Sequence, residues 1–527
     1  MKLLDFFRLK STPIFTVPGT HILNFLNMIN EVEDKVKIFR TEDGAGYGAI
    51  AVSALTGRPS TLIVTAGPGI TNIGTVLAQA YNDRIPLVVI GVNNWSNTLN
   101  ERIGTIHELG KTNILFSTIT EDSLTIDDPK TFPETINLAY SKAEKLRVPV
   151  YIDLPSDIFD YLLANDLDYS FKEPFCVASV NERFVDEIVD AINNSSKMLL
   201  YCGPCALSGA VQKLIYDLSE FLDVPIVTTL EIASFISHPN HIGSLLDRIF
   251  SNEYGRFHDV FLFSIGCDLG VLETGSGKFQ FDKALSLTYK KINRYQYKNA
   301  VVECDIEEVL VNVMEKLKRK KYVNTFTRFK DELMSLRREQ IDCYKRNYQN
   351  YRYFEQIQEA YGEDAVFFVD VFLEGYALTH FWRLDFKQKV VSSQNYVNLG
   401  FALPAAVGAS LENNNAVCLI GDGGFSYYFS EISTALKYGK KIKVLLFNNS
   451  SFGTIDVFAK NNKNLYSLAN PDYSKIAQAF RLNYYCCSGN GIKDIIDKAE
   501  TESNGYIIEI CMREKTPMFN RLNWELK

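Results

Sequence analysis

The chain has 527 residues, which is enough for about three domains that each bury a core of their own. Its 55 Lys and Arg residues are outnumbered by 63 Asp and Glu residues, and the net charge of −8 gives no electrostatic basis for binding nucleic acid or an anionic membrane. No apolar run approaches the roughly 20 residues of a membrane span, and charge interrupts the N-terminal residues too early for a secretory signal. Ten irregularly spaced cysteines indicate reduced thiols, so a cytoplasmic protein is expected.

Strands and helices alternate in three blocks that are joined by polar, charged stretches, which predicts an α/β protein with three doubly wound parallel-sheet domains. Short apolar runs predict strands at 60–65, 86–91, 149–153, 198–201, 225–228, 260–265, 365–370, 416–420 and 444–449. The predicted parts are a first domain (1–161), a linker (162–182), a central domain (183–317), a charged helical linker (318–352) and a third domain (353–527).

The first domain contains two features that could carry chemistry. Glu42 lies where a helix of small residues begins, and a Gly-rich turn, residues 65–72, follows the predicted strand 60–65. Taken alone, Glu42 is better explained as an acid that the helix dipole favours at a helix N-terminus.

The central domain offers one motif to weigh. Cys202-Gly203-Pro204-Cys205 follows an apolar strand and precedes a helix, a context in which CxxC can be a redox pair. The preferred interpretation is a tight turn between strand and helix. The basic run 316–321, at a predicted domain junction, is interpreted as a solvated linker, with a partner-binding patch as the alternative.

The third domain holds the most informative block. Gly421-Asp422-Gly423-Gly424 follows the apolar strand 416–420, so backbone N–H groups of a strand-to-helix turn could approach phosphate oxygens. A second strand brings Asn448 and Asn449 to the same edge of a parallel sheet. One carboxylate, one amide oxygen and a nearby carbonyl suit a hard ion such as Mg²⁺. The simpler alternative is a Gly-rich turn beside an incidental Asn-Asn loop.

The block resembles the thiamin diphosphate motif, which begins with GDG and ends with NN at a similar spacing. The resemblance implies that Asp422, Asn449 and the carbonyl of Ser451 hold Mg²⁺. It also implies that Gly421, Gly423 and Gly424 lie against the diphosphate of the cofactor.

The resemblance extends to the first domain, whose turn and following segment 81–87 stand in the family's order. It implies that Glu42 binds the cofactor pyrimidine and moves protons through it, and that Gly67, Pro68 and Asn72 line the cofactor site. Leu399, just before the GDG strand, would hold the cofactor in its bent shape, with an ordinary core leucine as the alternative.

The residues expected near the reacting carbon distinguish the activities of the family. Ile106-His107 matches only half of the His-His pair of pyruvate decarboxylases, and Thr20 and Ile455 stand where those enzymes carry acids. Acetolactate synthases have an aliphatic residue at the position of Ile455, so the pattern favours a carboligase. His107 would then orient or protonate the acceptor, with an ordinary surface-loop histidine as the alternative.

The resemblance implies a substrate pair, an oligomer and two rival functions. A 2-oxo acid, pyruvate in the first instance, would be decarboxylated and its acyl unit joined to a second carbonyl compound. Glu42 and Asp422 of one site would come from different chains of a homodimer or a dimer of dimers. The rivals are a 2-oxo acid decarboxylase that does not ligate and a non-catalytic cofactor-binding protein, the latter because Phe372 and Glu374 replace small residues near the diphosphate. FAD is a further alternative, based on a faint similarity of residues 266–279 to a synthase loop.

Overall fold

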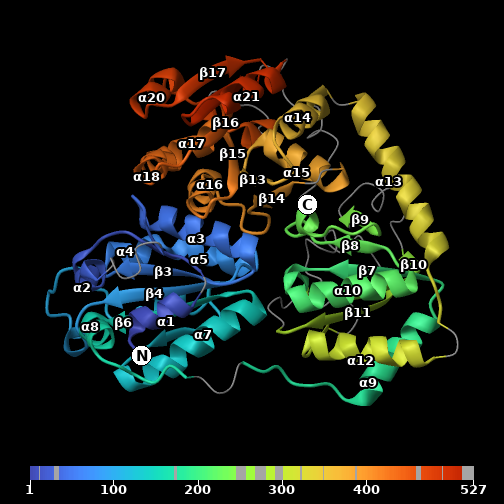
Figure 1. The fold of residues 1–527 in the computed structure, drawn as a ribbon, viewed down its shortest axis with the longest axis horizontal. Coiled ribbons are helices and arrows are strands. Elements are labelled where there is room, and N and C mark those ends of the chain that lie inside the picture. Colours follow the sequence, from blue (N-terminus) through green and yellow to red (C-terminus); the bar gives the residue numbers. More distant parts are fainter. Residues whose placement is uncertain are drawn as a thin grey trace. The chain divides into compact units, whose positions relative to one another are not determined.

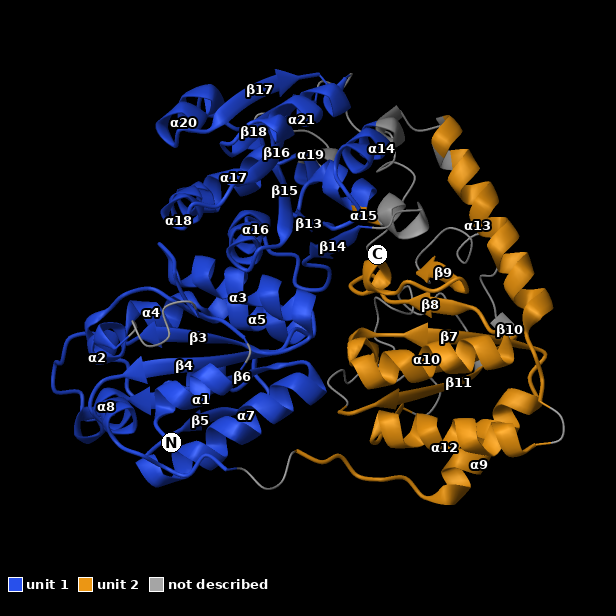
Figure 2. Cartoon of the chain, in the orientation of Figure 1, with its two compact units in different colours: residues 1–174, 353–378, 388–527 blue, residues 175–352, 379–387 orange. Residues whose placement is uncertain are grey.

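The computed structural model (Figure 1) describes most of the chain, and the statements below refer to those residues. They are 1–10, 12–28, 35–170, 175–244, 257–267, 281–290, 301–320, 323–347, 349–385, 388–458, 465–488 and 491–512. The chain divides into two compact units (Figure 2). The first consists of Met1–Pro174, Tyr353–Leu378 and Gln388–Lys527, and the second of Phe175–Arg352 and Thr379–Lys387.

Three six-stranded sheets with all-parallel strand pairs confirm the predicted α/β fold class. The first sheet has the strand order β2-β1-β3-β4-β6-β5. Its strands are β1 (Ile14–Thr16), β2 (Val36–Ile38), β3 (Ser60–Thr65), β4 (Leu87–Asn93), β5 (Ser123–Thr125) and β6 (Pro149–Pro155). β4 and β6 are buried along their whole length, as expected for central strands of a parallel sheet with helices on both faces.

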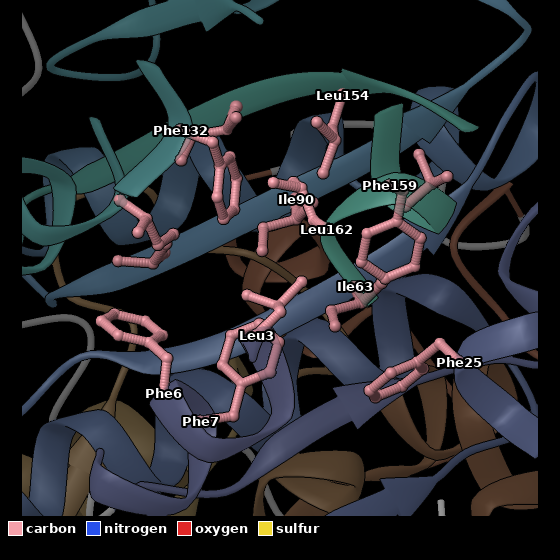
Figure 3. Packing of buried hydrophobic residues seen from close by; sticks show 14 of the residues in the cluster. Leu3, Phe6, Phe7, Phe25, Ile63, Ile90, Phe132, Leu154, Phe159 and Leu162 are labelled. Atoms are coloured by element: carbon pink, nitrogen blue, oxygen red, sulfur yellow. The ribbon is translucent and has the colours of Figure 1, made fainter. Parts of the chain in front are cut away.

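Helices of the first domain surround this sheet. They are α1 (Leu3–Leu9), η1 (Thr20–Ile22), α2 (Leu23–Asn27), α3 (Glu42–Thr56), α4 (Pro68–Asn72), α5 (Gly74–Asn82), η3 (Ser96–Thr98), α6 (Asn113–Phe116), η4 (Pro129–Thr131), α7 (Phe132–Leu146) and α8 (Ser156–Ala164). Figure 3 shows the core on one face, where Phe7 of α1 and Phe159 of α8 pack with Ile63 of β3 and Ile90 of β4. Burying each such side chain contributes roughly 1.5–3 kcal/mol, which holds the helices against the sheet.

The second sheet forms the centre of the second unit and has the strand order β12-β11-β10-β7-β8-β9. Its strands are β7 (Lys197–Cys202), β8 (Ile226–Thr228), β9 (His241–Ser244), β10 (Phe257–Ile265), β11 (Phe281–Thr288) and β12 (Val301–Glu303). The accompanying helices are α9 (Glu182–Asn193), η5 (Pro204–Leu207), α10 (Gly209–Leu222), η6 (Ala233–Phe235), α12 (Ile306–Arg319) and α13 (Thr327–Asn347). Of the segment compared with an FAD-contacting loop, all but Gly266 and Cys267 lies outside the described residues.

The Cys202–Cys205 motif forms a turn between strand and helix. Cys202 ends β7 and Cys205 lies in η5, and both are buried and outside any disulfide bond. Burial raises the pKa of the Cys202 thiol to about 12, which disfavours the thiolate that thiol–disulfide exchange requires. The turn interpretation therefore accounts for this motif without a redox role.

The third sheet has the strand order β14-β13-β15-β16-β18-β17. Its strands are β13 (Ala365–Val369), β14 (Lys389–Ser392), β15 (Asn415–Gly421), β16 (Lys443–Asn448), β17 (Asn483–Cys487) and β18 (Tyr506–Cys511). The helices of this part of the chain are α14 (Gln349–Ala360), α15 (Leu373–Asp385), α16 (Ala402–Leu411), α17 (Asp422–Tyr428), η7 (Phe429–Glu431), α18 (Ile432–Lys437), α19 (Gly453–Phe458), α20 (Tyr473–Ala479) and α21 (Ile492–Thr501).

Within the first unit, α3 of the first domain packs directly on α16 of the third domain (Figure 1). Glycine allows this close approach, because a Cβ atom at Gly408 would clash with the backbone of Gly48. The small residues that the sequence places after Glu42 thus serve the packing of two helices. This contact fixes the start of α3, and therefore Glu42, relative to the third sheet.

The boundaries at 161, 182, 317 and 352 remain predictions. Each sheet lies inside one predicted domain, and α13 lies inside the segment predicted as a charged helical linker. No helix within the described ranges has the length and apolar character needed to cross a membrane.

Candidate functional site

The first candidate site is the turn at the C-terminal end of β3. Gly67 has φ +66°, a conformation that glycine adopts without strain, and it caps the short helix α4. Asn72 at the end of α4 donates a hydrogen bond from Nδ2 to Glu42 Oε2 at 3.0 Å. The predicted residues Glu42, Gly67, Pro68 and Asn72 are therefore brought together at one sheet edge.

Glu42 does not serve as the cap of its own helix. The capping hydrogen bond at the start of α3 comes from Thr41, whose Oγ1 accepts from Gly44 N at 3.1 Å. The Glu42 carboxylate is half-buried and turned toward the β3 turn, since a Cβ atom built on Gly69 would lie 3.6 Å from Glu42 Oε1. The helix dipole acts on Glu42, but its side chain belongs to the turn rather than to the cap.

His107 lies against the same turn. A Cβ atom built on Gly67 would lie 2.6 Å from His107 Cβ, so only glycine fits there beside the histidine. His107 is exposed and has φ +61°, an uncommon conformation for a side-chain-bearing residue. It stands on a surface loop, as the simpler interpretation holds, but that loop is packed on the predicted cofactor turn.

A buried carboxylate anchors the end of the loop that carries His107. Asp153 Oδ2 accepts from Thr112 N at 2.9 Å, and Asp153 Oδ1 accepts from Asn93 Nδ2 at 3.0 Å. Asn93 Nδ2 also donates to the carbonyl of Gly110 at 2.8 Å. The strands β4 and β6 thus hold the loop at its C-terminal end.

The second candidate site is the shared edge of β15 and β16. Gly421 pairs with Phe447 in the parallel register, so Asp422 and the Asn448–Asn449 loop leave the sheet side by side. Asp422 is only 3% exposed, and its Oδ2 accepts from Asn470 Nδ2 at 2.7 Å. Burial raises the pKa of Asp422, and the hydrogen bond from Asn470 opposes that shift.

Hydrogen bonds to nearby loop residues hold the two asparagines at this edge in place. Asn449 Oδ1 accepts from Ser451 N at 3.0 Å, and Asn448 Oδ1 accepts from Asn470 Nδ2 at 3.0 Å. The Ser451 carbonyl accepts from Gly453 N at 2.8 Å, and its second lone pair remains for another partner. Asn470, which the sequence motif does not include, therefore joins the ends of β15 and β16.

The donor set at this edge fits Mg²⁺. Among the described residues, no group of three or more His, Cys, Asp or Glu side chains is arranged to hold a metal ion. The edge instead offers one carboxylate with amide and carbonyl oxygens, the hard ligands that Mg²⁺ takes together with phosphate oxygens and water. Glycine is required in the turn, because a Cβ atom at Gly424 would lie 2.9 Å from Asp370 Oδ1 and one at Gly423 would lie 2.9 Å from Phe452.

Phe372 and Glu374, the two large residues that replace small ones near the predicted diphosphate site, are accommodated by packing. Phe372 fills the space beside Gly421, and its ring centroid lies 4.9 Å from that of Phe447. Glu374 is buried in the first turn of α15, where the helix dipole favours an acid. Both substitutions are therefore compatible with this sheet edge.

Leu399 and Ile455 lie near this edge without being buried in a core. Leu399 is half-buried in the loop before α16, where Asp370 accepts from Gly400 N and Ala402 N, each at 3.0 Å. Ile455 is 51% exposed on α19, just after the Asn449 loop. Neither position matches that of an ordinary core side chain.

Glu431 connects the two candidate sites, and the sequence motifs did not single it out. Its carboxylate is fully buried and accepts hydrogen bonds from Thr41 N at 3.0 Å, Thr41 Oγ1 at 2.9 Å and Thr434 Oγ1 at 2.6 Å. Arg40 N donates to the same carboxylate. Burial raises the pKa of Glu431, and these hydrogen bonds counteract the shift. An acid in η7 thereby holds the residue that directly precedes Glu42.

Comparison with known families covers both sites. Residues 8–112 match the N-terminal TPP binding domain of thiamine pyrophosphate enzymes, and residues 374–510 match the C-terminal TPP binding domain of the same enzymes. The chain belongs to the thiamine pyrophosphate enzymes. The N-terminal match contains Glu42, Gly67 and His107, and the C-terminal match contains Leu399 and the block from Asp422 to Asn449.

Curated relatives of this thiamine pyrophosphate enzyme are similar at low identity over most of their length. A probable acetolactate synthase large subunit of Methanocaldococcus jannaschii is 24% identical, covering 96% of this chain and 90% of the relative. The mitochondrial acetolactate synthase catalytic subunit of Saccharomyces cerevisiae is 25% identical, covering 89% and 74%. A probable 2-ketoarginine decarboxylase of Pseudomonas aeruginosa is 24% identical, covering 89% and 85%. The names of these relatives thus include both synthases and a decarboxylase.

Proposed function

We propose that this chain is a carboligase that uses thiamin diphosphate and Mg²⁺ to decarboxylate a 2-oxo acid and join the acyl unit to a second carbonyl compound. Pyruvate is the proposed donor. The observation that carries the proposal is the apolar character of two positions beside the candidate sites: Ile455 is 51% exposed and Ile106 is 78% exposed. Apolar surroundings delay protonation of the reacting carbon, so that a second carbonyl can react first.

Different residues of the chain would have different roles in this reaction. When bound, thiamin diphosphate would supply the nucleophilic carbon and the electron sink that decarboxylation of a 2-oxo acid requires. Asp422, Asn449 and the Ser451 carbonyl would hold Mg²⁺, and Gly421, Gly423 and Gly424 would let backbone N–H groups meet the diphosphate. Glu42 would exchange a proton with the pyrimidine of the cofactor, and Leu399 would support the bent shape of the cofactor. His107 would protonate the oxygen of the acceptor.

Product analysis tests this proposal. The protein is incubated with thiamin diphosphate, Mg²⁺ and pyruvate, with and without added aldehydes and 2-oxo acids, and the products are separated and identified. Acetolactate, acetoin or a mixed ligation product is the expected result. Release of acetaldehyde alone, whichever acceptor is added, would overturn the ligation step.

A second candidate, a decarboxylase that does not ligate, is favoured by one observation. His107 lies against the Gly67 turn, where an imidazole could protonate the reacting carbon instead of an acceptor oxygen. The similarity to the probable 2-ketoarginine decarboxylase supports the same alternative. A non-catalytic role would show itself in calorimetry as the absence of Mg²⁺-dependent thiamin diphosphate binding.

A homodimer, or a dimer of dimers, is the proposed assembly, with Glu42 and Asp422 of one site on different chains. Large apolar side chains of the first domain are exposed in the isolated chain, which is the surface that a second copy could cover. These are Trp95 at 64%, Ile103 at 64%, Ile106 at 78%, Leu109 at 40%, Ile114 at 78% and Leu115 at 52% exposed.

Mixing two impaired variants, at Mg²⁺ and cofactor concentrations too low to load D422N, tests the shared site. In a dimer of E42Q with D422N, one site would carry both changes and the other would carry neither. Random reassortment of subunits would then restore about a quarter of the wild-type turnover, because half of the dimers are mixed and each has one intact site. If each site lay within one chain, every site would carry a lesion and no turnover would return.

A further inference from the structure

The loop that precedes Leu399 contains a strained backbone position. Val397 has φ +57°, and a β-branched residue rarely adopts this left-handed conformation, because its Cβ atom approaches the following carbonyl oxygen. The side chain of Val397 is 39% exposed, so burial of the side chain does not account for the strain. Strained conformations persist only where the surrounding structure imposes them, and they concentrate at functional sites. The cause therefore lies in the contacts of the loop 393–397.

A carboxylate of the first domain holds this loop. Asp83 follows α5 and is 4% exposed, and both segments belong to the first unit. Its Oδ1 accepts from Asn395 N at 2.8 Å and from Tyr396 N at 3.4 Å, and its Oδ2 accepts from Ser393 Oγ at 2.9 Å. Hydrogen bonds to an ionised carboxylate are about twice as strong as those between neutral groups. Asp83 thus binds three donors of a loop that lies 310 residues further along the chain.

Ser393 connects Asp83 to the strained residue. The Ser393 hydroxyl donates its proton to Asp83, and Ser393 Oγ accepts from Val397 N at 2.9 Å. A hydroxyl has one donor and two acceptor positions, so both hydrogen bonds can form together. Asn395 Nδ2 also donates to the Asn82 carbonyl at 3.1 Å, which joins the same two segments a second time. These contacts close the loop 393–397 and hold Val397 in its left-handed conformation.

The position of Leu399 depends on the same stretch of backbone. Leu399 is half-buried, so core packing alone does not fix its side chain. The residue before it, Asn398, donates from Nδ2 to Tyr47 Oη at 2.5 Å. The residue after it, Gly400, donates from N to Asp370 Oδ1 at 3.0 Å. Because the strained loop lies directly before these two contacts, a change in its backbone would displace Leu399.

We propose that Asp83 is a positioning residue, which holds the loop 393–397 in its strained conformation and thereby sets the position of Leu399 against the bound cofactor. The proposal rests on the proposed function, because Leu399 can support a cofactor only in an enzyme that binds one. Glycine at position 397 would adopt the same backbone conformation without strain. The need for Asp83 is therefore greatest in a chain that carries valine at this position.

Hydrogen–deuterium exchange of cofactor-free protein tests these contacts directly. In D83A the Asn395 amide should exchange about 10- to 100-fold faster, the change expected when a hydrogen bond to a charged acceptor is lost. In S393A the Val397 amide should exchange about 2- to 10-fold faster, because it loses a neutral hydroxyl acceptor. S393A removes a single hydroxyl group and keeps the test available even where D83A does not fold.

The matched control for D83A is D128A. Asp128 is an exposed residue of the same domain that also accepts a hydrogen bond from a backbone N–H group, that of Lys130 at 2.9 Å. This contact lies within the first domain and does not involve the loop 393–397. D128A should leave amide exchange in the loop and kcat as they are in wild type.

Turnover of the loaded enzyme connects the loop to the cofactor. At saturating Mg²⁺ and thiamin diphosphate, D83A should lower kcat by about 10- to 100-fold and leave KM nearly unchanged, because a misplacement of about 1 Å can cost about 100-fold. Adding V397G to D83A should recover a large part of this loss, since glycine adopts positive φ about as readily as negative φ. A variant that merely loosened the fold would not regain turnover through an added glycine.

Two results would overturn the proposal, even if product analysis confirms ligation. One is unchanged exchange of the Asn395 amide in D83A and of the Val397 amide in S393A. The other is equal kcat in D83A and in D83A/V397G, or in S393A and S393A/V397G where D83A does not fold. Absence of thiamin diphosphate binding to the wild type would instead defeat the proposed function, while the exchange measurements would still show whether Asp83 holds the loop.

Discussion

The edges of the first and third sheets are built from different kinds of residue. The first edge carries Glu42 and His107 as half-buried or exposed titratable side chains around the Gly67 turn. The third edge has the buried carboxylates of Asp422 and Asp370 among glycines and asparagine amides. A group that transfers protons must reach its substrate and change charge, whereas a metal ligand must stay fixed and ionised. The contrast supports the proposal that reactivity belongs to the first edge and anchoring to the third.

The largest expected effect comes from Glu42→Gln, which removes the proposed proton-exchanging group of the first edge but keeps the shape of the side chain. Turnover should fall by about 10²- to 10⁴-fold, while calorimetry should show nearly unchanged Mg²⁺-dependent binding of thiamin diphosphate. The control is Glu134→Gln, which changes an exposed first-turn acid of α7 in the same domain. If the two variants lost turnover equally, Glu42 would be only a helix-dipole acid.

Asp422→Asn, at the third edge, should instead weaken cofactor binding and leave turnover recoverable. Replacing the one carboxylate of the predicted donor set should weaken Mg²⁺-dependent cofactor binding by about 10- to 100-fold. Turnover should recover at high Mg²⁺ and cofactor concentrations, since the reactive edge is intact. Asp472→Asn, which changes an exposed cap of α20, is the control for charge alone. Equal affinity in wild type and D422N would show that the metal is not held at this edge.

The third edge was the more predictable of the two from the sequence. Asp422 and Asn449 follow two apolar runs, and adjacent parallel strands bring their C-terminal ends together whatever the rest of the chain does. The glycines could also be predicted, because the residue types that a short turn requires can be recognised in the local sequence. The fold class followed from the alternation of such runs.

The first edge depends on contacts between residues that are far apart in the sequence. His21 meets His107 only because η1 and the 103–110 loop both lie at the end of β3, and Glu431 reaches Thr41 across 390 residues. Neither residue has a local pattern that marks it. Asn470 was missed for the same reason, since an asparagine in a loop is ordinary until it is seen bonded to Asp422.

Glu431→Ala tests whether the third domain holds the first edge in place. The change leaves the N–H groups of Arg40 and Thr41 without their buried acceptor, which costs about 1–3 kcal/mol of folding free energy for an unsatisfied group. We expect a lower urea midpoint, and a loss of turnover larger than the loss of cofactor affinity, because Glu42 is the next residue.

Glu412→Gln is the matched control for Glu431→Ala. Glu412 also joins the third domain to the first, through an ion pair with Lys37 at 3.0 Å, but it does not touch the start of α3. A partly exposed pair of this kind contributes about 0–1 kcal/mol. If Glu412→Gln lowered turnover as much as Glu431→Ala, general loosening of the contact between the domains would explain both.

The smallest expected effect concerns Asp370, the buried carboxylate beneath the glycine turn of the third edge. Burial raises the pKa of Asp370 to about 6 from its ordinary value of 3.8, although Val371 N, Gly400 N and Ala402 N all donate to it. Folding therefore favours the protonated form of Asp370. The contribution of this carboxyl group to stability is fully present below about pH 3.8 and is lost as the pH rises through 6. Between pH 5 and 7, the unfolding free energy of the wild type should fall by about 1 kcal/mol relative to that of D370N. Urea titrations of cofactor-free protein measure it, and the exposed Asp364→Asn should show no such trend. A pH-independent difference for D370N would mean that Asp370 stays ionised and is as fixed in charge as the anchoring role of this edge requires.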